Sequence, residues 1–148
     1  MFVPIKKLYE DAKIPVAGSK NAAGYDLFAY IGDADGYYVY PGETVKFHTG
    51  IAASIPVGFF GAVFARSGAA TKRGLRPANC VGVIDSDYRG EIIVALHNDS
   101  DGIQWVQNGE RIAQLSIIPY LVIDGFEVVD ELDETARGDG GFGSTGSN

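Results

Sequence analysis

Five short segments of the chain carry residue types that could bind and act on an anionic ligand. They combine carboxylates, arginines, hydroxyl groups, amides and clustered glycines. The five segments are Ala22 to Leu27, Arg66 to Gly68, Asn79 to Gly90, Arg111 to Leu115, and Arg137 to Gly146. A carboxylate can take a proton from water as a general base, an arginine fork pairs with oxyanions at two points, and clustered backbone N–H groups bind anions. The segments therefore predict a site for a negatively charged ligand.

Several common catalytic and structural motifs do not occur in the sequence. It has neither the Gly-x-x-x-x-Gly-Lys-Ser/Thr phosphate loop nor the Gly-x-Ser-x-Gly nucleophile elbow. Two histidines without a recognisable Ser or Cys partner disfavour a catalytic triad. One cysteine cannot form an internal disulfide, and with two histidines it cannot build a usual structural zinc site. We therefore expect Cys80 to be a small, buried apolar residue.

The composition indicates one soluble domain that positions these segments. A length of 148 residues fits a single domain, and 46% hydrophobic with 21% charged residues is ordinary for a globular protein. Enrichment in glycine, with 20 residues, together with 8 Tyr and 8 Phe indicates short strands joined by tight turns. The formal net charge of −7 disfavours stable nucleic-acid binding. No signal peptide or membrane span is recognisable, so we expect a cytoplasmic protein without a membrane contact.

Alternating apolar and polar residues predict about ten short strands and one helix. The expected strands include Val3 to Leu8, Tyr25 to Ala29, Thr44 to Phe47, Ile51 to Ile55, Phe59 to Ala65, Val81 to Asp85, Ile92 to Leu96, Arg111 to Tyr120, and Phe126 to Val129. The polar stretch between Val81–Asp85 and Ile92–Leu96 indicates that these two strands form a hairpin. Phe59 to Ala65 is apolar throughout, which is typical of a strand buried on both faces. The short helix is expected over Ser67 to Arg73, ended by Gly74.

The end of the chain differs in composition from the rest. Residues 137–148 contain five glycines and one large apolar side chain, Phe142, so this stretch cannot order itself by burial. It does carry Arg137, hydroxyl groups and glycine N–H groups, which suit an anion. We therefore predict an all-β, sandwich-like or barrel-like domain over residues 1–136 and a flexible lid over residues 137–148.

Taken together and in this order, the five segments closely resemble the signature of the homotrimeric dUTP diphosphatases (dUTPases). The resemblance runs from Ala22 to the C-terminus, and Gly82 to Gly90 is its most specific part. It implies a jelly-roll (β-clip) subunit that hydrolyses dUTP to dUMP and pyrophosphate with Mg²⁺, by water attack on the α-phosphate. That activity limits uracil incorporation into DNA and supplies dUMP for thymidylate synthesis. The resemblance also implies a homotrimer with active sites shared between subunits.

The resemblance further implies roles for the residues of the third segment. Asp85 would be the base that activates water, and Tyr88 would pack against the deoxyribose and leave no room for a 2′-hydroxyl. The backbone of Val83 and Ile84 and the side-chain amide of Asn79 would pair with the edge of uracil. An amide can both donate and accept hydrogen bonds, so a site of this kind rejects bases whose groups it leaves unmatched.

The other four segments would bind the phosphates and the metal. The phosphate-binding set implied by the resemblance is Arg66, Ser67, Gly68, Gln114, Arg137, Gly143 and Ser144. Phe142 would stack over uracil, and Asp26 would help to hold Mg²⁺ through water, because Mg²⁺ keeps several waters and bridges substrate phosphates. Closure of the lid would exclude bulk water from the site.

Two departures from the family pattern and two alternative functions remain. Ala65 and Ala69 stand where the family often has Pro and Leu, which affects the rigidity of a loop. A dCTP deaminase has the same fold but carries a glutamate where this chain has Ala95, so deamination would lack its proton shuttle. The other alternative is a non-catalytic module that senses dUTP, and the presence of Asp85 argues against it.

Overall fold

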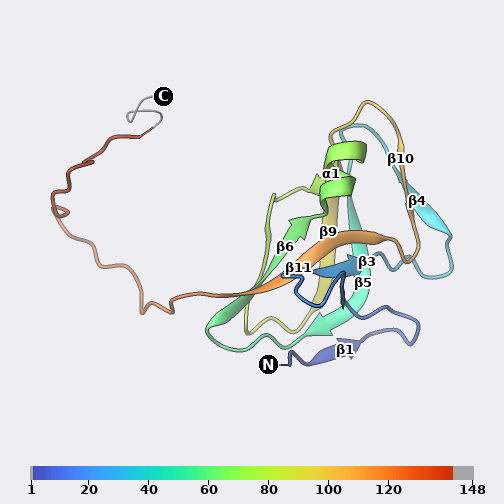
Figure 1. The fold of residues 1–148 in the computed structure, drawn as a ribbon, viewed down its shortest axis with the longest axis horizontal. Coiled ribbons are helices and arrows are strands. Elements are labelled where there is room, and N and C mark those ends of the chain that lie inside the picture. Colours follow the sequence, from blue (N-terminus) through green and yellow to red (C-terminus); the bar gives the residue numbers. More distant parts are fainter. Residues whose placement is uncertain (1, 142–148) are drawn as a thin grey trace.

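The structure, a computed structural model, describes residues 2–141, and its regular elements are short strands with one short helix (Figure 1). In chain order the elements are β1 (Ile5–Lys7), β2 (Val16–Ala17), β3 (Tyr25–Phe28), β4 (Gly36–Val39), β5 (Thr44–Ala53), β6 (Phe59–Ala65), α1 (Ser67–Arg73), β7 (Leu75–Pro77), β8 (Gly82–Ile84), β9 (Glu91–Asn98), β10 (Gln104–Gln107) and β11 (Arg111–Pro119). The predicted all-β class is confirmed. No helix among the described residues is long and apolar enough to cross a membrane.

Two antiparallel sheets enclose the core. One has the strand order β1-β5-β9-β7, the other has the order β2-β3-β11-β6-β8, and β10 pairs separately with β4. Alternation along β9 shows how the sequence builds the core, since Ile92, Val94 and Leu96 are buried while Ile93 is exposed on the other face. Leu27 and Leu115 contribute to the same core from the second sheet. The arrangement is the jelly-roll-like fold that the sequence predicts.

Strand β6 and helix α1 follow the sequence-based predictions closely. The central residues of β6, Gly61 to Val63, are buried, whereas the residues at both ends are half-buried. The helix ends at Gly74, which has a φ of 68° and whose N–H donates to the carbonyl of Ala70 at 3.1 Å. A Cβ at position 74 would lie 2.8 Å from the backbone nitrogen of Ser100, so both the φ and the contact require glycine.

The predicted hairpin of Val81–Asp85 with Ile92–Leu96 is wrong. Strand β8 pairs with β6 in the five-stranded sheet, whereas β9 pairs with β5 and β7 in the four-stranded sheet. The polar stretch between them therefore crosses from one sheet to the other. Apolar alternation reveals which side chains face the core, but it does not reveal which strand is the hydrogen-bonding neighbour.

The predicted strand at Phe126 to Val129 is also wrong. Residues 120–141 contain neither helix nor strand and run away from the sheets, in orange and red in Figure 1. The side chains of Phe126 and Val128 are 95% and 97% exposed. A strand forms on this kind of pattern only against a neighbouring strand and an apolar surface, and the described part of the single chain supplies neither here. The division between residues 136 and 137 stays a prediction.

Candidate active site

A pocket of about 290 Å³ lies between the end of β8 and the outer face of β9. Its lining residues are Val63, Pro77, Asn79, Gly82, Val83, Ile84, Asp85, Tyr88, Glu91, Ile93, Val94 and Ala95. The five residues of the third segment that are predicted to contact uracil, deoxyribose or the attacking water, namely Asn79, Val83, Ile84, Asp85 and Tyr88, are all among them. These five lie within residues 79–88, so one turn, β8 and a second turn place them together, and β9 supplies further lining residues of the pocket.

Strand β8 offers its backbone to the pocket. It is the outermost strand of the five-stranded sheet, and its only ladder within the described residues is with β6. An edge strand presents peptide N–H and C=O groups that no neighbouring strand uses. Because alternate residues of an edge strand turn their N–H and C=O to the free edge, a planar ligand with matching acceptors and donors can pair with the outward peptide groups of the Val83–Ile84 segment.

Asp85 and Tyr88 stand at the two ends of one tight turn. The N–H of Tyr88 donates to the carbonyl of Asp85 at 3.2 Å, and the hydroxyl of Tyr88 donates to the carbonyl of Glu91 at 2.9 Å. Gly90 makes this possible, since a Cβ there would lie 2.4 Å from the Tyr88 hydroxyl oxygen. Arg89 braces the turn by donating from Nη1 to the carbonyl of Ser86 at 2.7 Å. These hydrogen bonds thus fix the position of the half-exposed Tyr88 ring relative to the exposed carboxylate of Asp85.

Glu91 also lines the pocket, although the sequence did not indicate it as a site residue. Its Oε1 accepts the N–H of Gly50 at 2.7 Å, and its Oε2 lies 2.7 Å from Nδ1 of His48. The ladder between β5 and β9 is irregular between His48 and Ala52, and Gly50 has a φ of 70°. The Glu91 carboxylate therefore accepts the N–H of Gly50, which the bulge in β5 leaves without a partner in the strand ladder. No local signal in the sequence could reveal a bulge that lies 41 residues away.

A second cluster of predicted residues forms around Asp26, which is 6% exposed. Its Oδ1 accepts from Nε of Arg66 at 2.9 Å, and its Oδ2 accepts from Nη1 of Arg111 at 3.3 Å. Gln114 is the cross-strand partner of Asp26, and its Oε1 would lie 2.9 Å from a Cβ at Gly24. Arg111 is a further residue of this cluster to which sequence reasoning gave no separate role.

Ser67 and Gly68 lie next to this cluster as the first two residues of α1. Both are exposed, and Arg66 is the residue that immediately precedes the helix. Their N–H groups are among the first of the helix, where no intrahelical acceptor is available. They can therefore donate to an oxyanion held by Arg66.

The two clusters lie apart within one chain. Ile84 is opposite Gly61 on β6, and Asp85 follows it, whereas Arg66 comes after the other end of the same strand. Five residues separate Gly61 from Arg66, which corresponds to about 17 Å of extended strand. The structure thus brings each predicted set together but does not bring the two sets into one pocket.

The two guanidinium groups beside Asp26 disfavour a cation bound directly to its carboxylate, so these residues fit only a metal that a ligand carries. Among residues 2–141 no group of three or more His, Cys, Asp and Glu side chains is placed to hold a metal ion. Each oxygen of Asp26 accepts one arginine hydrogen bond and has further acceptor capacity. It can therefore accept hydrogen bonds from the waters of a hydrated Mg²⁺, which is the expected role of Asp26.

The remaining predictions concern Cys80 and the C-terminal segment. Cys80 is exposed rather than buried, and it adopts a φ of 62° directly after Asn79, so the expectation of a buried apolar residue is wrong. A turn position, not core packing, determines its environment. Arg137 is exposed, and its Nε donates to the carbonyl of Gly140 at 2.8 Å. The predicted roles of Phe142, Gly143 and Ser144 fall outside the described residues.

Comparison with known proteins links this geometry to one family. The family model described as dUTPase matches residues 10–146. The deoxyuridine 5′-triphosphate nucleotidohydrolase of Escherichia phage T5 is 46% identical over 148 residues, covering 98% of this chain and 99% of that protein. The protein of the same name from Desulfitobacterium hafniense (strain DSM 10664 / DCB-2) is 50% identical over 135 residues, covering 90% of this chain and 87% of that protein.

Solved structures agree with this match. A dUTPase mutant of Staphylococcus bacteriophage 80alpha, solved with dUpNHpp, has a TM-score of 0.83 at 28% identity, over 99% of both chains. A mutant dUTPase from phage phi11 of S. aureus has a TM-score of 0.75 at 27% identity, over 88% of this chain and 98% of that one. That second structure is described as revealing the coordination of a structural Mg(II) ion.

Proposed function

This chain belongs to the dUTPase family and hydrolyses dUTP to dUMP and pyrophosphate, and we propose that Asp85 supplies the general base for that reaction. The observation that carries the proposal is the shared pocket, which Asn79, Val83, Asp85 and Tyr88 all line. A carboxylate that takes the proton of the attacking water contributes about 10²–10⁴-fold to the rate. Asp85 is exposed at the end of β8 and can meet a water there.

Base selection rests on the free edge of β8 and on Asn79. Peptide groups of Val83 and Ile84 pair with the Watson–Crick edge of uracil, and the Asn79 amide completes the set. Cytosine reverses donor and acceptor at two positions of that edge, N3 and the 4-substituent, and leaves buried groups unpaired, which is a costly mismatch. Ala95 occupies the position at which a deaminase carries its glutamate, and the pocket's Glu91 is held by Gly50 and His48. This supports hydrolysis over deamination.

Sugar selection rests on Tyr88. Its ring lies at the pocket wall, fixed by the hydrogen bond from its hydroxyl to the carbonyl of Glu91. A deoxyribose packs against such a ring, whereas a 2′-hydroxyl overlaps with it and loses its hydration. UTP is therefore a poor substrate.

The cluster around Asp26 binds the triphosphate. Asp26 holds the guanidinium of Arg66 by its Nε, so little side-chain freedom is left to lose when phosphate binds. The N–H groups of Ser67 and Gly68 and the amide of Gln114 add donors. Asp26 would accept hydrogen bonds from the waters of a Mg²⁺ held by the phosphates, and that ion would supply neutralisation of phosphate charge.

A complete site requires more than one copy of the chain. Asp85 follows Ile84, the partner of Gly61, whereas Arg66 follows the end of β6, about 17 Å of extended strand away. This separation favours a site in which the two sets come from different copies. In a homotrimer the pocket of one copy meets the phosphate cluster of another. Residues 120–141 extend from the sheets (Figure 1), and a stretch of that length reaches up to about 70 Å. Arg137 of a further copy can therefore grip the γ-phosphate, while Phe142, Gly143 and Ser144 close over the ligand.

A pyrophosphate-release assay tests the proposal. We expect release from dUTP in the presence of Mg²⁺, and much slower release from dCTP, dTTP and UTP. Equal rates with the four nucleotides would contradict the assignment of Asn79, β8 and Tyr88 to substrate selection.

A further inference from the structure

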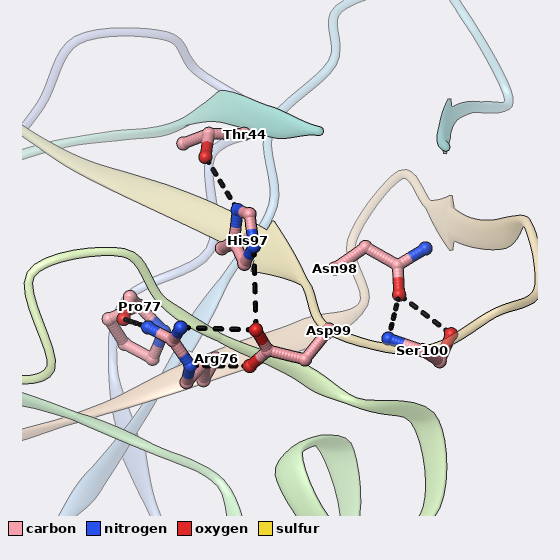
Figure 2. A network of polar contacts seen from close by, with 7 residues as sticks. All are labelled: Thr44, Arg76, Pro77, His97, Asn98, Asp99 and Ser100. Carbon is pink, nitrogen blue, oxygen red and sulfur yellow. Dashed lines mark hydrogen bonds and ion pairs between the residues drawn. The ribbon is translucent and has the colours of Figure 1, made fainter. Parts of the chain in front are cut away.

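Arg76, Asp99 and His97 form an ion-pair network on the four-stranded sheet (Figure 2). It lies next to the Asp85 pocket, because Pro77, which follows Arg76, lines that pocket. Asp99 accepts from Nε of Arg76 at 2.5 Å and from Nη2 of Arg76 at 3.1 Å, each with a separate oxygen. His97 lies beside the pair, with Nε2 at 3.4 Å from Asp99 and Nδ1 at 2.9 Å from the hydroxyl of Thr44. A bidentate pair of this kind fixes the plane of the guanidinium as well as its position.

Asp99 is itself held in place by its neighbour. Asn98 is fully buried, and its Nδ2 donates to the carbonyls of Val39 at 2.9 Å and Gly102 at 2.8 Å. Its Oδ1 accepts from the N–H and the hydroxyl of Ser100, as Figure 2 shows. The loop that carries Asp99 is therefore pinned to the core on one side, and it can serve as a fixed anchor on the other.

The free end of the Arg76 fork reaches the turn that carries Asn79. Nη1 of Arg76 donates to the carbonyl of Pro77 at 3.3 Å, and the same carbonyl accepts the N–H of Cys80 at 3.1 Å. Pro77 to Cys80 is thus a β-turn with Asn79 as its third residue. The second residue of the turn, Ala78, donates its N–H at 2.8 Å to the carbonyl of Ala95, which also lines the pocket.

This turn is strained directly after Asn79. Cys80 has a φ of 62°, the only positive φ of a non-glycine residue in the described chain, and the N–H of Val81 donates to the carbonyl of Asn79 at 2.7 Å. A three-residue turn with a positive φ at its centre is rare and costly for a residue with a Cβ. Such a conformation persists only where surrounding contacts determine it.

We propose that the Arg76–Asp99 ion pair is a positioning device that holds the strained Pro77–Val81 turn and thereby aims the Asn79 amide at the base of the substrate. This inference rests on the proposed role of Asn79 in base selection. The charges of the two side chains support the positioning role of the ion pair, because the hydrogen bond from Arg76 lowers the pKa of Asp99 below its ordinary value of 3.8. The same hydrogen bond raises the pKa of Arg76. Both groups therefore stay charged at neutral pH.

The test compares Asp99→Asn and Arg76→Lys with Asp101→Asn. Asp101 lies in the same loop as Asp99 and is exposed, so Asp101→Asn makes the same change of charge outside the network. Arg76→Lys retains the charge but loses the fork that spans Asp99 and Pro77. For both network variants we expect the KM for dUTP to rise about five- to tenfold with kcat nearly unchanged, because binding to the base is lost equally in ground and transition states. The preference for dUTP over dCTP should fall by a similar factor, and Asp99→Glu should restore part of it.

A double-mutant cycle with Asn79→Ala separates positioning from a general loss of stability. If the ion pair acts through Asn79, the double variant Asn79→Ala/Asp99→Asn should have nearly the same KM for dUTP as Asn79→Ala alone. The effects of the two substitutions on the KM are then not additive. Two results would overturn the inference and leave the proposed function intact. One is additive effects of Asp99→Asn and Asn79→Ala on the KM. The other is a KM and a base preference in both network variants that equal those of Asp101→Asn. Unchanged base preference in Asn79→Ala alone would instead remove the proposed role of Asn79.

Discussion

Nε of Arg66 lies 2.9 Å from Oδ1 of Asp26, and this ion pair joins two strands that are far apart in the sequence. Asp26 is on β3, and Arg66 follows β6, with β11 between them in the sheet. The second oxygen of Asp26 faces Arg111, so one buried carboxylate compensates two guanidinium groups. A triphosphate would meet an arginine that is already oriented.

Asp26→Asn should reduce both stability and substrate affinity. The amide cannot balance two positive groups, and we expect a loss of about 1–3 kcal/mol in the free energy of unfolding. The KM for dUTP should rise about tenfold as Arg66 loses its orientation. Thermal unfolding and steady-state kinetics check the two effects, with the exposed Asp124→Asn as a control that changes neither. An unchanged KM in a folded Asp26→Asn protein would contradict the positioning of Arg66.

Mixing two inactive variants should restore activity if the site is shared between copies. Asp85→Asn lacks the proposed base and Arg66→Gln lacks the proposed phosphate fork, so each alone should have strongly reduced activity. In randomly mixed homotrimers about a quarter of the sites combine an intact Asp85 with an intact Arg66 from another copy. Pyrophosphate release by co-expressed variants measures this directly. If both residues served the same site within one copy, no mixture would recover activity.

Tyr88→Ala should narrow the preference for dUTP over UTP, because the ring no longer overlaps with a 2′-hydroxyl. Tyr88→Phe is the matched control. It retains the ring and loses only the hydrogen bond to the carbonyl of Glu91, so most of the discrimination should persist. The ratio of kcat/KM for the two nucleotides is the measurement, and an equal ratio in the Ala variant and the unaltered protein would assign sugar selection elsewhere.

The pH dependence of stability should reveal the Asp99 interaction. The pKa of Asp99 is lowered in the folded protein, chiefly by the hydrogen bond from Arg76. A carboxyl with a lowered folded pKa stabilises the protein above its unfolded pKa, and that contribution is lost as the pH falls through the folded pKa. The difference in stability between the unaltered protein and Asp99→Asn should therefore be constant near neutral pH and shrink below the ordinary value of 3.8. A difference that grows on acidification would contradict this sign.

Local secondary structure could be predicted from the sequence better than the pairing of strands. Helix α1 could be placed because Ser67 to Arg73 is followed by Gly74, a local stop signal. The hairpin failed because nothing in Val81 to Asp85 encodes that its partner is β6. Likewise, the apolar pattern at Phe126 to Val129 describes what that segment could bury, and the described chain offers no neighbouring strand to it.

The candidate site shows the same contrast. Asn79, Asp85 and Tyr88 could be singled out because they lie in one continuous, specific segment, and they share a pocket. Glu91 and the Arg76–Asp99 pair could not, since their importance comes from contacts with residues distant in the sequence. The exposed position of Cys80 follows from the turn after Asn79, which composition alone does not predict.

The most direct test of the central claim measures single-turnover hydrolysis and binding of dUTP by Asp85→Asn. The amide retains the shape of the carboxylate but cannot accept the proton of the attacking water. We expect nearly unchanged affinity for dUTP, measured by isothermal titration with a non-hydrolysable analogue, and pyrophosphate release slower by at least about 100-fold. Release at a rate close to that of the unaltered protein would show that another group activates the water.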